Sequence, residues 1–92
     1  MTEFDFEDGN GPVPAKRHLN GDGWVADTAT VAETVYVGPD ARVYGDAEVF
    51  DDAMVYGKAK VCDKAKVYYK AKVYDKAQVF GKASVAGVAQ VH

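Results

Sequence analysis

Valine returns at every sixth position from Val25 to Val91, and alanine stands two places before most of these valines. The run "VYGKAKVCDKAKVYYKAKVYDKAQVFGKA" keeps the pattern without a break. Six residues correspond to about one and two-thirds turns of an α-helix, so a helix would scatter the valines around its circumference. The period therefore excludes a helix. An antiparallel meander is harder to exclude, although its hairpins favour two-residue turns between longer strands.

Each Ala-x-Val unit is typical of a very short strand. Residues i and i+2 of a strand lie on the same face, so the alanine and the valine share one side while the residue between them points away. An aromatic or small residue follows most valines, and Gly, Asp or Lys come next, which favours a bend. A chain that bends after every hexapeptide, in a strict internal repeat, is predicted to form a solenoid.

Units such as "VYGDAE", "VYGKAK" and "VFGKAS" resemble the hexapeptide repeat of the left-handed parallel β-helix family. The resemblance covers Trp24 to His92. It implies an all-β fold in which three hexapeptides form one triangular coil, and the valines in register then imply about four coils. Residues three hexapeptides apart would stack on one another in neighbouring coils.

The segment that precedes the repeat has a different composition. Residues 1–23 are rich in Gly, Pro and acidic residues and show no period, so we expect an irregular arm that also caps the first coil, with Trp24 closing the core. Residues 24–92 are predicted to form the β-helix domain.

The cellular compartment is inferred from the membrane span, signal peptide and cysteine pairs that the sequence lacks. No hydrophobic run is long enough to span a membrane, and the acidic start lacks the positive n-region and apolar core of a signal peptide. Cys62 is the single cysteine, which excludes an internal disulfide framework. A reducing cytoplasm is therefore expected.

At the predicted turns an Asp in one coil meets a Lys in the next. In the coil model, the vertical neighbours are Asp40 under Lys58 and Lys76, Asp46 under Lys64 and Lys82, and Asp52 under Lys70. Exposed pairs contribute about 0 to 1 kcal/mol each. We expect a solvated charge ladder whose main effect is to help fix the coil register.

Charge is also segregated along the chain. Residues 1–52 hold twelve acidic and three basic residues, and residues 53–92 hold two acidic and eight basic residues, which gives −9 and +6. The lysine-rich half lacks arginine and any recognised nucleic-acid motif, which argues against nucleic acid as a partner. The opposite charges favour docking of the acidic arm, or of a neighbouring molecule, onto the basic coils.

Aromatic side chains beside the inward valines define the candidate contact surface. One face carries Tyr36, Met54, Tyr56 and Tyr74, a second carries Tyr44 and Phe80, and a third carries Phe50 and Tyr68. Stacked rings could simply stabilise adjacent coils, by about 0.5–1.5 kcal/mol per pair. Contiguous exposed apolar area with Tyr and Met is also typical of interfaces. We expect these side chains to form a partner or oligomer interface.

Catalysis is not expected. Many hexapeptide-repeat proteins are acyltransferases, so the resemblance implies a general-base histidine at a subunit junction and a loop thrown out of a coil. This chain has His18 in the expected cap and His92 at its end, and no insertion interrupts the register after Val25. The fold-similar carbonic anhydrases imply three histidine ligands, and no Cys and His cluster here has zinc spacing. We expect no catalytic residue, metal or cofactor.

A looser resemblance relates "VPAKRHLNGDGWVADTATV" and the units after it to small hexapeptide-repeat proteins of phages and prophages. It implies a non-catalytic accessory protein in the cytoplasm of a bacterial host, which binds and blocks a host factor such as a defence system. The alternatives are a trimeric acyltransferase-like enzyme and a purely structural oligomer. An uncapped final coil favours self-association, so we expect a homodimer, with a trimer as the alternative.

Overall fold

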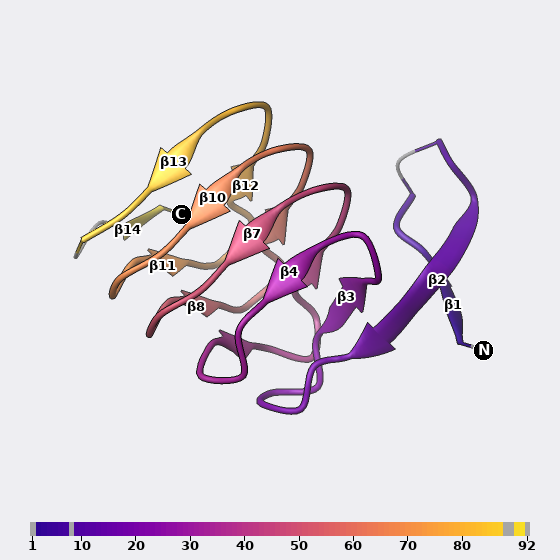
Figure 1. The fold of residues 1–92 in the computed structure, drawn as a ribbon, viewed down its shortest axis with the longest axis horizontal. Coiled ribbons are helices and arrows are strands. Elements are labelled where there is room, and N and C mark those ends of the chain that lie inside the picture. The colour runs from indigo at the N-terminus through magenta and orange to yellow at the C-terminus, as the bar shows by residue number, and fades with distance from the viewer. Residues whose placement is uncertain (1, 8, 88–89, 92) are drawn as a thin grey trace.

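A computed structural model of the chain describes residues 2–7, 9–87 and 90–91. The strands are short and form three sheets (Figure 1). In hydrogen-bonded order, the first sheet comprises β1 (Glu3–Asp5), β2 (Pro12–Arg17), β3 (Trp24–Ala26), β6 (Arg42–Val43), β9 (Lys60–Val61) and β12 (Gln78–Val79). The second comprises β4 (Thr30–Val31), β7 (Glu48–Val49), β10 (Lys66–Val67) and β13 (Ser84–Val85). The third comprises β5 (Tyr36–Val37), β8 (Met54–Val55), β11 (Lys72–Val73) and β14 (Gln90–Val91).

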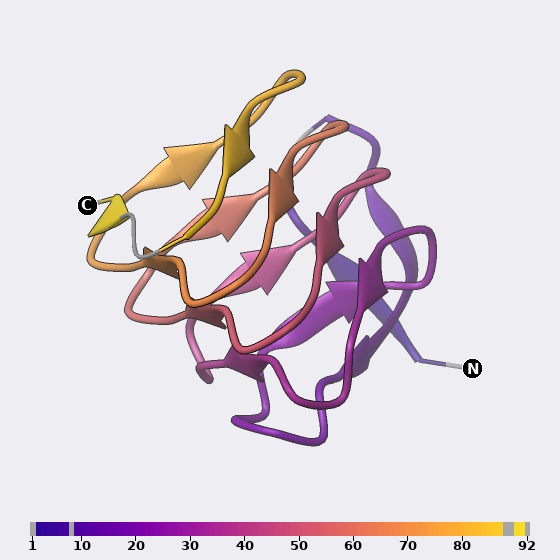
Figure 2. The ribbon, with the colours of Figure 1, turned by 60° about the vertical axis from the view of Figure 1, so that its left-hand side comes forward.

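From β3 onward, each strand pairs in parallel with the strand three places further along the chain. Val37 pairs with Val55, and Val55 pairs with Val73, so successive rungs are 18 residues apart. The result is a parallel β-solenoid of about four turns (Figure 2). No helix occurs in the described residues. The predicted all-β solenoid is confirmed, and its left hand stays a prediction of the family resemblance.

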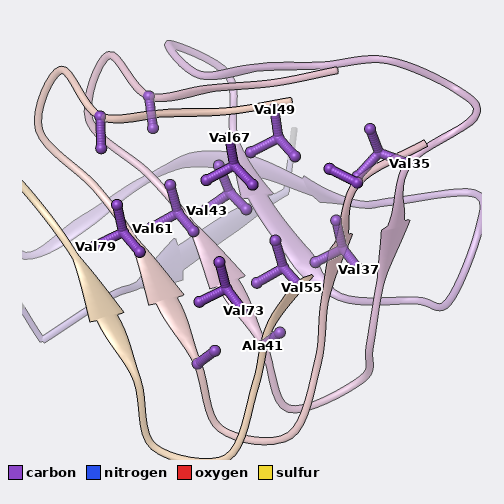
Figure 3. Packing of buried hydrophobic residues seen from close by; sticks show 14 of the residues in the cluster. Val35, Val37, Ala41, Val43, Val49, Val55, Val61, Val67, Val73 and Val79 are labelled. Atoms are coloured by element: carbon purple, nitrogen blue, oxygen red, sulfur yellow. The ribbon is translucent and has the colours of Figure 1, made fainter. Parts of the chain in front are cut away.

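The interior of the solenoid is a column of valine and alanine. Val55 and Val73 are fully buried, and so are Ala53 and Ala71, which precede them by two places. Figure 3 shows valine side chains pointing from the coils into the space that they enclose. Full burial of one valine contributes about 1.5–3 kcal/mol, so the repeated pair of residues supplies the principal hydrophobic core.

The turns between rungs repeat a left-handed backbone conformation. Every sixth residue from position 45 to position 87 has a φ between 58° and 69°. These residues are Gly45, Asp51, Gly57, Asp63, Tyr69, Asp75, Gly81 and Gly87. Glycine adopts positive φ freely, and Asp adopts it more readily than most residues. This requirement explains why Gly or Asp stands two places after most valines, and it makes Tyr69 an exception.

Two glycines at equivalent turns should respond differently to alanine. A Cβ on Gly57 would lie 2.8 Å from the backbone nitrogen of Asp75 in the next coil, whereas a Cβ on Gly81 would meet nothing within 4 Å. Both variants force a side chain into the left-handed region, which costs about 1–2 kcal/mol. Because Gly57→Ala also pushes two coils apart, we expect it to lower the free energy of unfolding by a further ~1 kcal/mol or more. Urea unfolding measures both losses, and equal values would contradict the close stacking of these turns.

The N-terminal segment forms a β-hairpin where the composition predicts an irregular arm. β1 pairs antiparallel with β2, and β2 pairs antiparallel with β3, so the hairpin extends the first sheet beyond the first coil (Figure 1). Phe6 is 1% exposed and forms a second hydrophobic cluster with Ala15 and Ala26, against which Trp24 and Tyr44 pack. Trp24 therefore lies on the outer face of the sheet, because it alternates with the inward Val25. The expectation that Trp24 closes the core was wrong.

The chain between β2 and β3 closes the N-terminal end of the solenoid. His18 is 5% exposed, and its Nε2 lies 2.7 Å from the carbonyl oxygen of Val35. The N–H of Gly23 donates to the carbonyl oxygen of Val37 at 2.9 Å, and the N–H of Val37 donates to that of Asn20 at 3.0 Å. These bonds satisfy the outer edge of β5, so this segment acts as the cap of the first coil.

Candidate functional site

The outward side chains of the third sheet form what we call the tyrosine face, which comprises Tyr36, Met54, Tyr56 and Tyr74. All four side chains are half-buried. The rings of Tyr56 and Tyr74 stack with 5.2 Å between their centroids and an interplanar angle of 8°. The Tyr74 hydroxyl donates a hydrogen bond of 3.2 Å to Oε1 of Gln90. The stack thus ties neighbouring coils together and leaves part of each ring accessible.

The second sheet carries another aromatic column, which ends at a corner of the solenoid. Phe50 and Tyr68 stack at 5.1 Å with an interplanar angle of 4°, and Tyr69 meets Tyr68 edge-on at 4.9 Å. We call these three residues the corner cluster. The N–H of Tyr69 donates to Oδ2 of Asp51 at 3.1 Å, and a hollow of about 590 Å³ runs along this corner. Tyr69 is 59% exposed. Sequence reasoning missed it, although its departure from Gly or Asp was visible.

The two remaining residues of the predicted interface, Tyr44 and Phe80, both lie on the first sheet but differ in exposure. Tyr44 is covered by the protein's own hairpin, because its ring stacks on Phe6 at 4.9 Å with an interplanar angle of 22°. Phe4 stacks in the same way on Trp24 at 4.5 Å. Phe80, two rungs further along the sheet, is 60% exposed. Tyr44 is therefore not part of an open interface as the sequence predicted, because the N-terminal hairpin packs on it.

The residues of the predicted charge ladder all lie at turns, and all are exposed. They are Asp40, Asp46, Asp52, Lys58, Lys64, Lys70, Lys76 and Lys82. Within the described part of the chain, the ion pairs join Glu7 to Arg42 at 3.4 Å and Glu48 to Lys66 at 3.9 Å, so neither involves a ladder residue. The ladder residues stack without pairing, which fits the small energy of a solvated surface pair.

Two arginines lie on aromatic rings beside the hairpin. The guanidinium carbon of Arg17 is 4.6 Å from the ring centroid of Trp24, and that of Arg42 is 5.0 Å from the ring centroid of Phe4. Such contacts contribute about 0.5–1 kcal/mol at exposed sites. Sequence reasoning gave these arginines no role, because the contacts depend on where the hairpin docks.

His18 is a structural element of the cap. His18 is buried, and its Nε2 bonds to a main-chain carbonyl. His92 lies outside the described residues. In the part of the chain that the structure describes, no group of three or more His, Cys, Asp or Glu side chains could hold a metal ion. No helix among the described residues has the length and apolarity needed to cross a bilayer.

Comparison of the chain with protein-family models, with curated proteins and with solved structures gives no match. The solenoid fold rests on the strand pairing itself. The hexapeptide-repeat family and the phage relationship stay predictions from the residues. The candidate surfaces are therefore weighed by their geometry and chemistry.

Proposed function

We propose that the protein is a non-catalytic binding module that recognises another protein through the corner cluster and the tyrosine face. The conformation of Tyr69 carries this proposal. The seven equivalent turn positions hold Gly or Asp, whereas Tyr69 adopts a φ of 58°. A left-handed conformation costs a residue such as Tyr about 1–2 kcal/mol, and backbone outliers of this kind cluster at functional sites. A large exposed ring at this position is unfavourable for the left-handed turn but suits contact with a partner protein.

The rings around Tyr69 suit a protein interface. Tyr68 is held between Phe50 below it and Tyr69 at its edge, so little side-chain entropy is lost when a partner covers the group. Tyrosine gives a large contact area with few rotatable bonds and is enriched among interface hot spots. The tyrosine face adds a second rigid stack on the neighbouring sheet.

The resemblance to phage and prophage proteins supports a bacterial host factor, such as a component of a defence system, as the partner. Binding would block that factor stoichiometrically, without turnover. We propose that the module acts as a homodimer, with a trimer as the alternative, and light scattering on the purified protein gives its mass. The acyltransferase alternative gains no support from His18, whose Nε2 is engaged by Val35 inside the cap.

Tyr69→Asp tests the proposal, because it installs the residue found at the equivalent turns of Asp51, Asp63 and Asp75. The partner is first captured from host lysate with the wild-type protein, identified by mass spectrometry and purified. We expect Tyr69→Asp to unfold at the same or a higher temperature, since it relieves the turn, and to weaken binding by about tenfold or more, since a central interface tyrosine is lost.

Phe80→Asp serves as the matched control, because Phe80 is equally exposed on a different sheet. We expect it to keep wild-type affinity. Unchanged binding by Tyr69→Asp, or an equal loss in both variants, would contradict the corner cluster as the contact surface. A lower unfolding temperature for Tyr69→Asp would show that the ring serves the fold.

A further inference from the structure

A groove of about 640 Å³ lies between the N-terminal hairpin and the outer face of the first sheet, and it continues onto the adjoining turn. Aromatic rings of Phe4 and Trp24 form part of its wall. Its cationic side chains outnumber the acidic ones, Glu7 and Asp40. The cations are Arg17, Arg42, Lys58, Lys60 and Lys76. We call this site the basic groove.

The cations of the basic groove lie on strands of the first sheet and on the adjoining turns. Arg17 and Arg42 are held over aromatic rings by the contacts described above. Lys60 is paired with Arg42 in the strand register and therefore lies one rung above it. Lys58 and Lys76 occupy the same turn in successive coils. The three lysines form no ion pair with another described residue, so their charge is available to a ligand.

One carboxylate of the chain already occupies the rim of this groove. Oε1 of Glu7 lies 3.4 Å from Nη1 of Arg42, and the Glu7 side chain is 71% exposed. Glu7 follows β1 at a backbone φ of 61°, and its N–H donates to Oδ1 of Asp5 at 2.8 Å. An exposed pair of this kind is weak and easily displaced. The hairpin thus presents a carboxylate to the arginine that a ligand would use.

We propose that the basic groove binds an acidic segment of a partner protein, with Glu7 as a built-in competitor. A carboxylate of the segment would replace Glu7 on Arg42, and further carboxylates would reach Lys58, Lys60 and Lys76. Arginine suits this role because its planar fork matches a carboxylate. The groove lies on a different sheet from the tyrosine face and the corner cluster, so this site and the proposed aromatic interface succeed or fail separately.

Charge favours a short acidic peptide over nucleic acid. The whole chain carries a net charge of −3, and residues 1–52 alone carry −9. The hairpin beside the groove contributes Glu3, Asp5 and Glu7. A nucleic acid extends its charge far beyond a groove of this size and would meet those carboxylates, whereas a short peptide can confine its charge to the groove.

Fluorescence anisotropy with a labelled oligoglutamate peptide tests the site, and an oligoglutamine peptide of equal length is the reference probe. The groove variant is Lys58→Gln with Lys76→Gln. Its control is Lys64→Gln with Lys82→Gln, which removes the same charge from the same position of the neighbouring turns in the same coils. We expect the groove variant to weaken oligoglutamate binding about fivefold, because each exposed charge pair contributes a factor of about two to three, and the control to leave it unchanged.

Glu7→Gln should strengthen oligoglutamate binding, whereas the groove variant weakens it, if Glu7 competes for Arg42. We expect about a twofold to threefold gain in affinity for oligoglutamate, since one exposed ion pair no longer has to be broken. Equal losses in the groove variant and its control, no oligoglutamate binding by the wild-type protein, or weaker binding by Glu7→Gln would overturn the proposal. Binding of an oligothymidylate of equal charge with the same dependence on Lys58 and Lys76 would also overturn it and would assign the groove to nucleic acid.

Discussion

Val61→Asp is expected to unfold the solenoid. Val61 is fully buried and lies in register between Val43 and Val79, so the variant would enclose a carboxylate with no partner. Burial of an unpaired charge ranks among the largest effects of single substitutions, above about 4 kcal/mol. Typical domains have a total stability of about 5–15 kcal/mol. Thermal unfolding followed by circular dichroism should show a large drop in the midpoint or no folded baseline.

Gln78→Asp is the control for this experiment. It introduces the same carboxylate at an exposed outward position of β12, the strand that pairs with β9. Surface substitutions of this kind change stability by about 0.5 kcal/mol or less, so we expect a midpoint near that of the wild type. A wild-type midpoint for Val61→Asp would show that the valines do not form the core.

Phe6→Ala has the second largest expected effect, and it should act on the hairpin more than on the coils. Phe6 is 1% exposed and contacts Phe4 edge-on at 4.8 Å as well as stacking on Tyr44. Truncation of a buried phenylalanine costs about 3–5 kcal/mol. We expect amide hydrogens of β1 and β2 to exchange much faster, while those of β8 to β11 stay protected.

Phe80→Ala provides the same truncation on the same sheet at a side chain that is 60% exposed. It should change stability by less than about 1 kcal/mol and leave the hairpin protected. Hydrogen exchange read by mass spectrometry separates the two segments in both variants. Uniform loss of protection across the chain in Phe6→Ala would mean that the hairpin and the coils unfold as one unit.

The valine period predicted short strands in a solenoid, and the family resemblance implied three hexapeptides per coil. An interior that accepts one residue size at every rung leaves a direct trace in the sequence, and with the three hexapeptides per coil that the resemblance implies, Val37 is expected to pair with Val55, as it does. Bends were predicted where Gly and Asp follow the valines, and the structure gives the cause, because a left-handed φ restricts the choice to a few residue types. Contacts of long exposed side chains leave no such trace. Among the described residues the ladder lysines form no ion pair, whereas Lys66 pairs with Glu48 on the strands, and the sequence pattern distinguished neither outcome.

The hairpin was harder to predict because proline stands at two of the six positions of β2. The N–H of Ala15 donates to Thr2, so Pro14 faces the opposite side, where its carbonyl accepts from Asp27 just past the end of β3. Neither Pro14 nor Pro12 therefore removes a ladder hydrogen bond to β1. A signal for the hairpin was present, because Phe4 and Phe6 alternate with acidic residues in "EFDFE" ahead of the turn-forming "GNG".

The uniform interior also shapes how such a protein can evolve. Most rungs have valine and alanine inside, whereas the residues on either side of each valine face outward and have no part in that packing. Outside the cluster under the hairpin, selection can therefore rewrite the outward positions singly without repacking a core. In-frame duplication of 18 residues would add one rung to each sheet and keep the existing pairs in register. A lineage built on this coil can change what it binds, and how far it reaches, faster than it changes its fold.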